Sequence, residues 1–192
     1  MYHELPDRAT FWAFLFSVDQ DLAQTARQKA CPCGGRLHRA NYPRKSRGAE
    51  EFPKDYDDRF SFCCARDGCR KRVTPPSVRF LGRKVYLFAV VVLVSAMRQG
   101  SSPRRVRELS QIFGADRRTI ARWQMFWREH VPQTPFWKVA RGWLPTTAES
   151  VLLPRSLLDV FLRGDDLCQA WGNLLLFLSP ITTTAGAPNE VT

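Results

Sequence analysis

Two short cysteine clusters constrain the fold of this chain more than any other feature of its sequence. The first is CPCGG at residues 31–35, and the second is CCARDGC at residues 63–69. A structural zinc ion takes four thiolate or imidazole ligands in a tetrahedron. Gly34, Gly35 and Gly68 free the backbone for the narrow turns on which each pair of ligands must stand. The pattern predicts a zinc ribbon, a small β domain whose folding depends on its metal ion.

The spacing leaves the ligand set partly open. The predicted ligands of the Zn²⁺ ion are Cys31, Cys33, Cys64 and Cys69. The first pair has one residue between its cysteines and the second pair has four, whereas C-x-x-C is more usual. Cys63 is the alternative to Cys64, and His38 is the alternative to one of the first pair. Because successive strand residues point to opposite faces, Cys63 and Cys64 are not both expected at one metal ion.

The start of the chain bears on the oxidation state of these cysteines. In MYHELPDRATFWAFLFSVDQ, Glu4 and Asp7 replace a cationic leader region, and no small-residue cleavage site follows the aromatic run. We therefore expect no export signal and a cytoplasmic protein, in which clustered cysteines indicate a metal site before a disulfide. A redox dithiol and chance clustering are the alternatives. Cys168, with Leu167 and Trp171 as neighbours, is predicted to be a buried apolar thiol.

No membrane partner is expected. The most apolar stretch, residues 85–97, has cationic neighbours on both sides and is shorter than the roughly 20 residues that cross a bilayer. It predicts a buried helix.

Charge is unevenly distributed along the sequence. Residues 27–128 hold 24 Lys and Arg against 8 Asp and Glu, while the remainder of the chain holds 5 against 10. A basic centre between mildly acidic ends favours a partner that is a polyanion. The alternative is a solvated basic face with no partner.

The predicted fold is mainly α with a small β zinc ribbon. Residues 1–29 form an N-terminal helix, and residues 30–81 form the ribbon, with a long loop inserted between strands at 35–42 and 59–62. Residues 82–131 are a helical module. Residues 132–192 are a proline-interrupted tail with helices at 155–163 and 166–178, and the last residues are expected to be disordered.

The helical module has the layout of a helix-turn-helix. One helix begins near Ser102 and Pro103 and ends at Gly114, and a second begins at Asp116 or Arg117. The first residues of the second helix reach base edges in such motifs, and the helix before it contacts phosphates. The predicted base contacts are Arg117, Arg118, Thr119 and Arg122. The predicted phosphate contacts are Arg104, Arg105 and Arg107.

Apolar side chains of the second helix support this arrangement. Ile120 and Trp123 are predicted to pack inward against Leu109 and Phe113. The alternative is an ordinary helical hairpin with a basic face.

The order of these parts is similar to that of a known family. CPCGG, then FCCARDGC with RKRVTPP after it, an apolar helix, the linker RQGSSP and the helix pair through ADRRTIARW resemble the front half of bacterial insertion-sequence transposases with a zinc ribbon before a helix-turn-helix. The resemblance covers residues 30–130. It implies binding to double-stranded DNA at the ends of a mobile element, and a bacterial cytoplasmic protein associated with the nucleoid.

The family's acidic catalytic domain is not expected in this chain. It would follow residue 130, where about sixty residues rich in proline and leucine remain. Four acidic residues there form no convincing metal-binding set: Asp159, Asp165, Asp166 and Glu190. We therefore expect a DNA-binding protein that is not an enzyme, an accessory or regulatory protein of a mobile element. Its other partners would be a separate transposase subunit, or a second copy bound through the N-terminal helix or the C-terminal tail.

Three other functions remain open. In the first, the ribbon itself binds RNA, as in proteins of translation or transcription. In the second, the chain is a degenerate transposase fragment without a current role. The third is an enzyme. The sequence offers no pair of a base and a nucleophile for one, because the three histidines are scattered and isolated: His3, His38 and His130.

Overall fold

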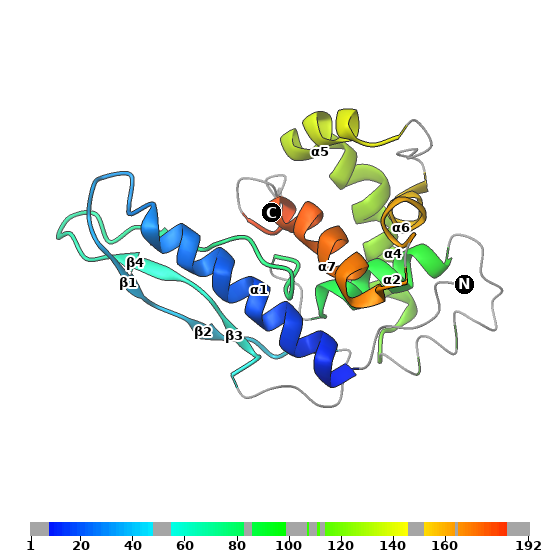
Figure 1. The fold of residues 1–192 in the computed structure, drawn as a ribbon, viewed down its shortest axis with the longest axis horizontal. Coiled ribbons are helices and arrows are strands. Elements are labelled where there is room, and N and C mark those ends of the chain that lie inside the picture. The colour runs from blue at the N-terminus through cyan, green and yellow to red at the C-terminus, as the bar shows by residue number, and fades with distance from the viewer. Residues whose placement is uncertain are drawn as a thin grey trace.

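The computed structural model describes residues 8–47, 55–82, 86–98, 107, 111, 114–145, 152–163 and 165–183. These residues form a mainly helical protein with two small antiparallel sheets and one cluster of cysteines. The predicted fold class is confirmed to that extent. Figure 1 shows a long helix, α1 (Arg8–Gln28), that lies along the strands at one end of the molecule, with the remaining helices gathered at the other end.

α1 matches the helix predicted at the start of the chain. Its buried side chains recur every three or four residues: Phe11, Trp12, Leu15, Asp19 and Ala23. This spacing places them on one face of an α-helix. The buried face continues from the helical end of the molecule to the ribbon.

The strands form two sheets. In the first, β1 (Leu37–Arg39), β4 (Phe62–Cys64) and β5 (Arg72–Val73) pair in the order β1-β4-β5, all antiparallel. In the second, β2 (Tyr42–Pro43) pairs with β3 (Asp58–Arg59). The two sheets continue each other along the ribbon, since β2 follows β1 and β3 precedes β4. β1 to β4 lie within or beside the two predicted strand segments, whereas β5 was not predicted.

α2 (Phe88–Arg98) follows the ribbon and packs against the helices at 117–125, 155–161 and 167–178. The next helices are α4 (Arg117–Met125), α5 (Pro135–Ala140), α6 (Arg155–Phe161) and α7 (Leu167–Leu178). A π-helical turn at Phe126–His130 and a 3-10 turn at Val131–Gln133 join α4 to α5; further 3-10 turns follow α5 at Arg141–Trp143 and α7 at Ser179–Thr182. The described side chains of α2 are buried all round, as expected of a helix at the centre of a core.

Helices α6 and α7 agree with the two helices predicted in the tail, and the apolar stretch at 85–97 contains α2. α5 was not expected. It begins at Pro135, and Thr134 caps it by accepting a hydrogen bond from the N–H of Trp137. Proline at the first helical position is favourable because its missing N–H has no partner in the helix. Within the described residues, no helix combines the length and the apolar character needed to cross a bilayer.

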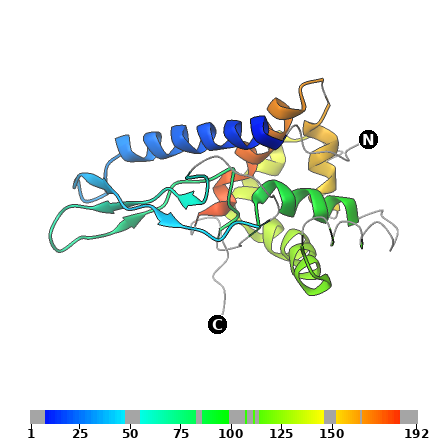
Figure 2. The same cartoon turned by 90° about the horizontal axis from the view of Figure 1, so that it is seen from below.

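The described residues form two hydrophobic cores, and α1 contributes to both. The main core takes buried side chains from α1, from residues 56 and 78–81, and from all the later helices. A smaller core under the ribbon contains Ala23, Leu37, Phe60 and Phe62 beside two of the cysteines. Phe16 packs against both cores. In Figure 2 the second half of α1 lies over the strands, so that helix and ribbon together project from the helical body.

A buried ion pair fixes this junction. Asp19 of α1 accepts hydrogen bonds from Ser77 Oγ at 2.6 Å and from the Val78 N–H at 2.6 Å. Its Oδ2 lies 2.8 Å from Arg79 Nε, and both side chains are fully buried. Arg79 also donates to the carbonyl groups of Tyr56 and Asp58 and lies over four aromatic rings, among them Phe16 and Phe80. The two charges therefore compensate each other where helix, ribbon and core meet.

Candidate functional site

Four cysteine sulfurs come together at the far end of the ribbon. The Sγ atoms of Cys31, Cys33, Cys64 and Cys69 all lie within 4.8 Å of one another. Cys31 Sγ is 3.8 Å from Cys69 Sγ, and Cys33 Sγ is 3.5 Å from Cys64 Sγ. In a tetrahedral site with metal–sulfur bonds of about 2.3 Å, the sulfurs would be about 3.8 Å apart. The donor set and its dimensions fit one metal ion, and these are the four ligands predicted from the sequence.

Tight turns present the two pairs of sulfurs. The Gly34 N–H donates to the Cys31 carbonyl at 2.7 Å, and the Cys31 N–H donates to the Gly35 carbonyl at 3.1 Å. In the second turn the Cys69 N–H donates to the Arg66 carbonyl at 3.1 Å, and Gly68 has a φ of +82°. Both turns are therefore closed by backbone hydrogen bonds, with glycine where the left-handed conformation is needed.

Gly35 has a different function from the glycines in the turns. A Cβ atom at this position would lie 2.5 Å from Cys64 Sγ and 3.3 Å from Cys33 Sγ. A contact of 2.5 Å essentially never occurs, so any other residue would push the Cys64 sulfur away from its position, and the 3.3 Å contact with the Cys33 sulfur would be tight. At position 35 there is room for the hydrogen atom of a glycine and for no larger side chain.

The two alternative ligands lie outside the cluster. Cys63 pairs with His38 across the β1–β4 ladder, while Cys64 pairs with Leu37. Directly paired residues share a face of a sheet, and neighbours along a strand do not. Cys63 and His38 thus occupy the face opposite to Cys64, and Cys63 Sγ lies 3.4 Å from the Arg70 carbonyl.

The electrostatics of the cluster are those of a cation site. The Gly35 N–H, followed by the neighbouring thiols, lowers the pKa of Cys33 to about 6. The Arg66 N–H acts on Cys64 in the same direction, but burial and the three other thiols outweigh it and raise the pKa of Cys64 to about 12. Cys33 therefore forms a thiolate readily, whereas a second thiolate at Cys64 beside it is unfavourable. A bound cation removes this conflict and deprotonates its thiol ligands.

The second group of predicted residues lies at the start of α4. Asp116 caps this helix, accepting from the Thr119 N–H at 2.8 Å and from the Thr119 hydroxyl at 3.1 Å. These two hydrogen bonds lower the pKa of Asp116, and the bond from the Thr119 N–H has the larger effect. The capping carboxylate is therefore lost only when the pH falls through this lowered pKa. The cap fixes the first turn of α4.

The first two turns of α4 have a basic outer face and an apolar inner face. Arg117, Arg118 and Arg122 are exposed and, with Asp116 and Thr119, surround a depression in the surface. Ile120 and Trp123 are buried on the opposite face, as predicted. The structure therefore brings together four of the seven residues predicted to contact DNA.

The helix predicted before α4 lies mostly outside the described residues. Arg104 and Arg105 are among the residues not described, as are Leu109 and Phe113. Arg107 is helical and exposed. Gly114 has a φ of +61° and accepts a hydrogen bond at its carbonyl from the Tyr86 hydroxyl at 2.7 Å. A left-handed glycine fits the predicted end of a helix, and the helix-turn-helix itself stays a prediction.

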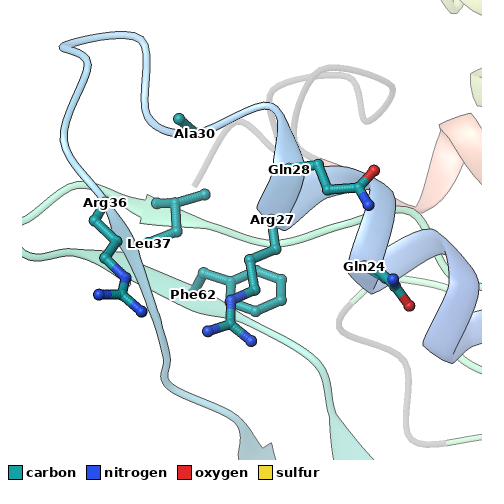
Figure 3. Close-up of a pocket in the computed structure, with 7 residues that line it drawn as sticks. All are labelled: Gln24, Arg27, Gln28, Ala30, Arg36, Leu37 and Phe62. Atoms are coloured by element: carbon teal, nitrogen blue, oxygen red, sulfur yellow. The ribbon is translucent and has the colours of Figure 1, made fainter.

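The structure also contains a basic groove that the sequence analysis does not predict. It lies between the last turns of α1 and the β1–β4 pair, and Figure 3 shows the residues that line it. These are Gln24, Arg27, Gln28, Ala30, Arg36, Leu37 and Phe62. The signal that could have revealed it is charge: residues 27–47 contain seven Lys and Arg and no Asp or Glu.

One further prediction needs correction. Cys168 was expected to be a buried apolar thiol, but it is only partly buried and packs at the edge of the main core. It stands near the start of α7, where one side of the helix faces solvent.

Comparisons with protein-family models, with curated proteins and with solved structures find no match to this chain.

Proposed function

We propose that this chain is a zinc-dependent protein that binds double-stranded DNA with a sequence preference, through α4, and that it acts as an accessory or regulatory protein of a mobile element. The observation that carries the proposal is the face of α4 that the cap at Asp116 holds in place. Three exposed arginines and a half-buried threonine lie there on two successive turns, over a buried apolar face.

Zinc is the metal ion that best suits the cysteine cluster. Four thiolates at tetrahedral spacing favour zinc or iron over harder ions, and a site with four protein ligands has no open position for catalysis. Because the cluster joins residues from two distant turns, the ion would stabilise the ribbon and not react. Structural zinc of this kind supplies folding free energy to a small domain.

Arginine is the side chain best suited to base recognition from the start of a helix. Its planar guanidinium donates two parallel hydrogen bonds to the O6 and N7 atoms of guanine in the major groove. In the proposed complex Arg117, Arg118 and Arg122 contact base edges, and Thr119 contacts a base or a phosphate. The positive end of the helix dipole favours approach of the phosphate backbone to the same turn.

Binding without cleavage is the activity proposed. Of the acidic residues after residue 130, Asp166 caps α7 by accepting from the Gln169 N–H at 3.0 Å, which gives it a structural role. The resemblance of residues 30–130 to the front half of insertion-sequence transposases supports DNA at the ends of a mobile element as the target. The nuclease would then be supplied by a separate subunit.

A selection of bound sequences from a random pool of duplexes tests the proposal. Wild type should enrich one motif, and Arg118→Ala should bind that motif roughly 1–3 kcal/mol more weakly and lose discrimination at one base position. The matched control is Arg128→Ala. Arg128 is an exposed arginine that follows α4 and pairs with Glu129 at 2.7 Å.

Arg105→Ala completes the comparison. As a phosphate contact it should weaken binding to all sequences alike and reduce the dependence on salt by about one unit of slope. If wild type and Arg118→Ala enrich the same motif equally sharply, α4 is not the recognition helix. Tighter binding to structured RNA than to duplex DNA of equal length would favour an RNA-binding ribbon in its place.

A further inference from the structure

We propose that the groove between α1 and the ribbon binds the phosphate backbone of duplex DNA, at a place outside the base pairs that α4 contacts. The inference rests on the proposed function, because it assumes that the partner is duplex DNA. It adds a second contact surface, made by Arg27 of α1 and Arg36 of the ribbon.

Both arginines are available to bind an anion. Arg27 and Arg36 are exposed, and neither guanidinium has a hydrogen bond or an ion pair within the described part of the chain. Figure 3 shows the two guanidinium groups on the same side of the groove, one from the helix and one from the strand side. By contrast, Arg70 of the ribbon is paired with Asp67 at 3.0 Å, and Arg66 donates to the Cys33 carbonyl at 2.8 Å.

The local charge favours a polyanion. The end of α1 carries the negative pole of its helix dipole, worth about half an elementary charge. Arg27 and Lys29 more than offset it, and no Asp or Glu occurs between residues 27 and 47. The groove has a volume of about 570 Å³, which is in the range of sites that hold molecules of nucleotide size. Further basic residues follow on the same hairpin: Arg39, Arg44, Lys45 and Arg47. A ligand with repeated phosphates matches this charge better than a single free phosphate does.

The position of the groove determines which part of the DNA it would contact. In Figures 1 and 2 the ribbon end of α1 and the helix α4 lie toward opposite ends of the long axis of the molecule. One turn of the double helix, about 10 base pairs, covers about 34 Å, and a recognition helix occupies the major groove within such a turn. The groove contact therefore needs a longer duplex.

The decisive experiment measures the salt dependence of binding for the full zinc-loaded chain. Three proteins are compared: wild type, the double variant Arg27→Gln/Arg36→Gln, and the control Lys138→Gln/Arg141→Gln, which removes two exposed charges near α5. Each is titrated with a duplex of about 10 base pairs and with one of about 30 base pairs that contain the same motif. Equal zinc content and equal circular dichroism show that the variants are folded.

On the long duplex, the groove variant should lose about two units of the log–log salt slope, since each phosphate contact contributes about 0.9. On the short duplex it should bind like wild type, and the control should match wild type on both. In parallel, the Nε–Hε resonances of Arg27 and Arg36 should shift with the long duplex and stay in place with the short one.

The outcomes separate this inference from the proposed function. A groove variant with the same slope as the control on the long duplex overturns the inference, even if Arg118→Ala loses its base preference. If the groove variant has a reduced salt slope on the long duplex while Arg118→Ala keeps the base preference of wild type, the groove contact stands and α4 is not the recognition helix. Failure of wild type to bind either duplex overturns both.

Discussion

Asp19 Oδ2 and Arg79 Nε are 2.8 Å apart with no solvent contact, and they join the middle of α1 to the segment that leaves the ribbon. Removing one charge of a buried pair leaves the other without compensation, which costs about 3–5 kcal/mol. We expect Asp19→Ala to lower the free energy of unfolding by this amount in a urea titration.

Two further variants test the origin of that loss. Asp67→Ala breaks the exposed pair with Arg70 and should leave the unfolding midpoint unchanged, because solvent screens that pair. The double variant Asp19→Leu/Arg79→Met should regain only part of the lost stability: it leaves no uncompensated charge, but the Val78 N–H and the Asp58 carbonyl lose their partners. If Asp19→Ala unfolds like wild type, the ion pair does not hold the junction.

Neighbouring cysteines should differ in their effect on the metal. Purified wild type should contain about one equivalent of zinc per chain, bound by four thiolates. Cys69→Ser removes a ligand and should abolish tight binding, whereas Cys63→Ser should retain the full equivalent, because Cys63 Sγ faces the Arg70 carbonyl on the other side of the sheet. Elemental analysis after dialysis gives the result. If Cys63→Ser loses zinc and Cys64→Ser keeps it, then Cys63 and not Cys64 is the ligand.

A methyl group at Gly35 should weaken the metal site without removing a ligand. The new Cβ would lie 2.5 Å from Cys64 Sγ, so the sulfur must move. Changes next to metal ligands commonly reduce affinity by about 10–100-fold, and we expect Gly35→Ala to fall in this range in a chelator competition. Gly142→Ala is the matched control because a Cβ there meets no atom within 4 Å. Equal affinities for the two variants would show that the cluster tolerates the displacement.

Two tryptophans provide a test of the packing under α4. Trp123 is buried and its ring centre is 5.0 Å from that of Tyr86, edge to face, while Trp143 is 75% exposed. Trp123→Ala should destabilise the protein by about 3–5 kcal/mol, as for other buried large aromatic side chains, and Trp143→Ala should have little effect. Thermal unfolding by circular dichroism distinguishes them. A stable Trp123→Ala protein would mean that the inner face of α4 is not essential to the fold.

The helices that could be predicted are those with a clear local pattern. α1, α6 and α7 follow from apolar side chains at helical spacing, and α7 has a capping aspartate at Asp166. α5 does not follow from the sequence pattern because prolines at 132 and 135 are typical of interruptions, although Thr134 followed by Pro135 is a favourable helix start.

The cysteine cluster could be predicted because its pattern is local, with two of its cysteines on each turn. Strand alternation also separated Cys63 from Cys64 correctly in space. The groove and the Asp19–Arg79 pair could not be found in this way. They depend on contacts between segments far apart in sequence, Asp19 with Arg79 across 60 positions, for which no local period exists.

The sharing of α1 between two cores limits how the ribbon could be exchanged between proteins. Ala23, Phe16 and Ala26 of α1 pack against the small core around Leu37 and Phe60, while Phe11 and Leu15 of the same helix belong to the main core. A fragment that starts at the first cysteine would keep every metal ligand and lose one wall of its interior. The transplantable unit therefore includes the second half of α1, and a graft onto another scaffold would need a helix that continues rigidly into its host.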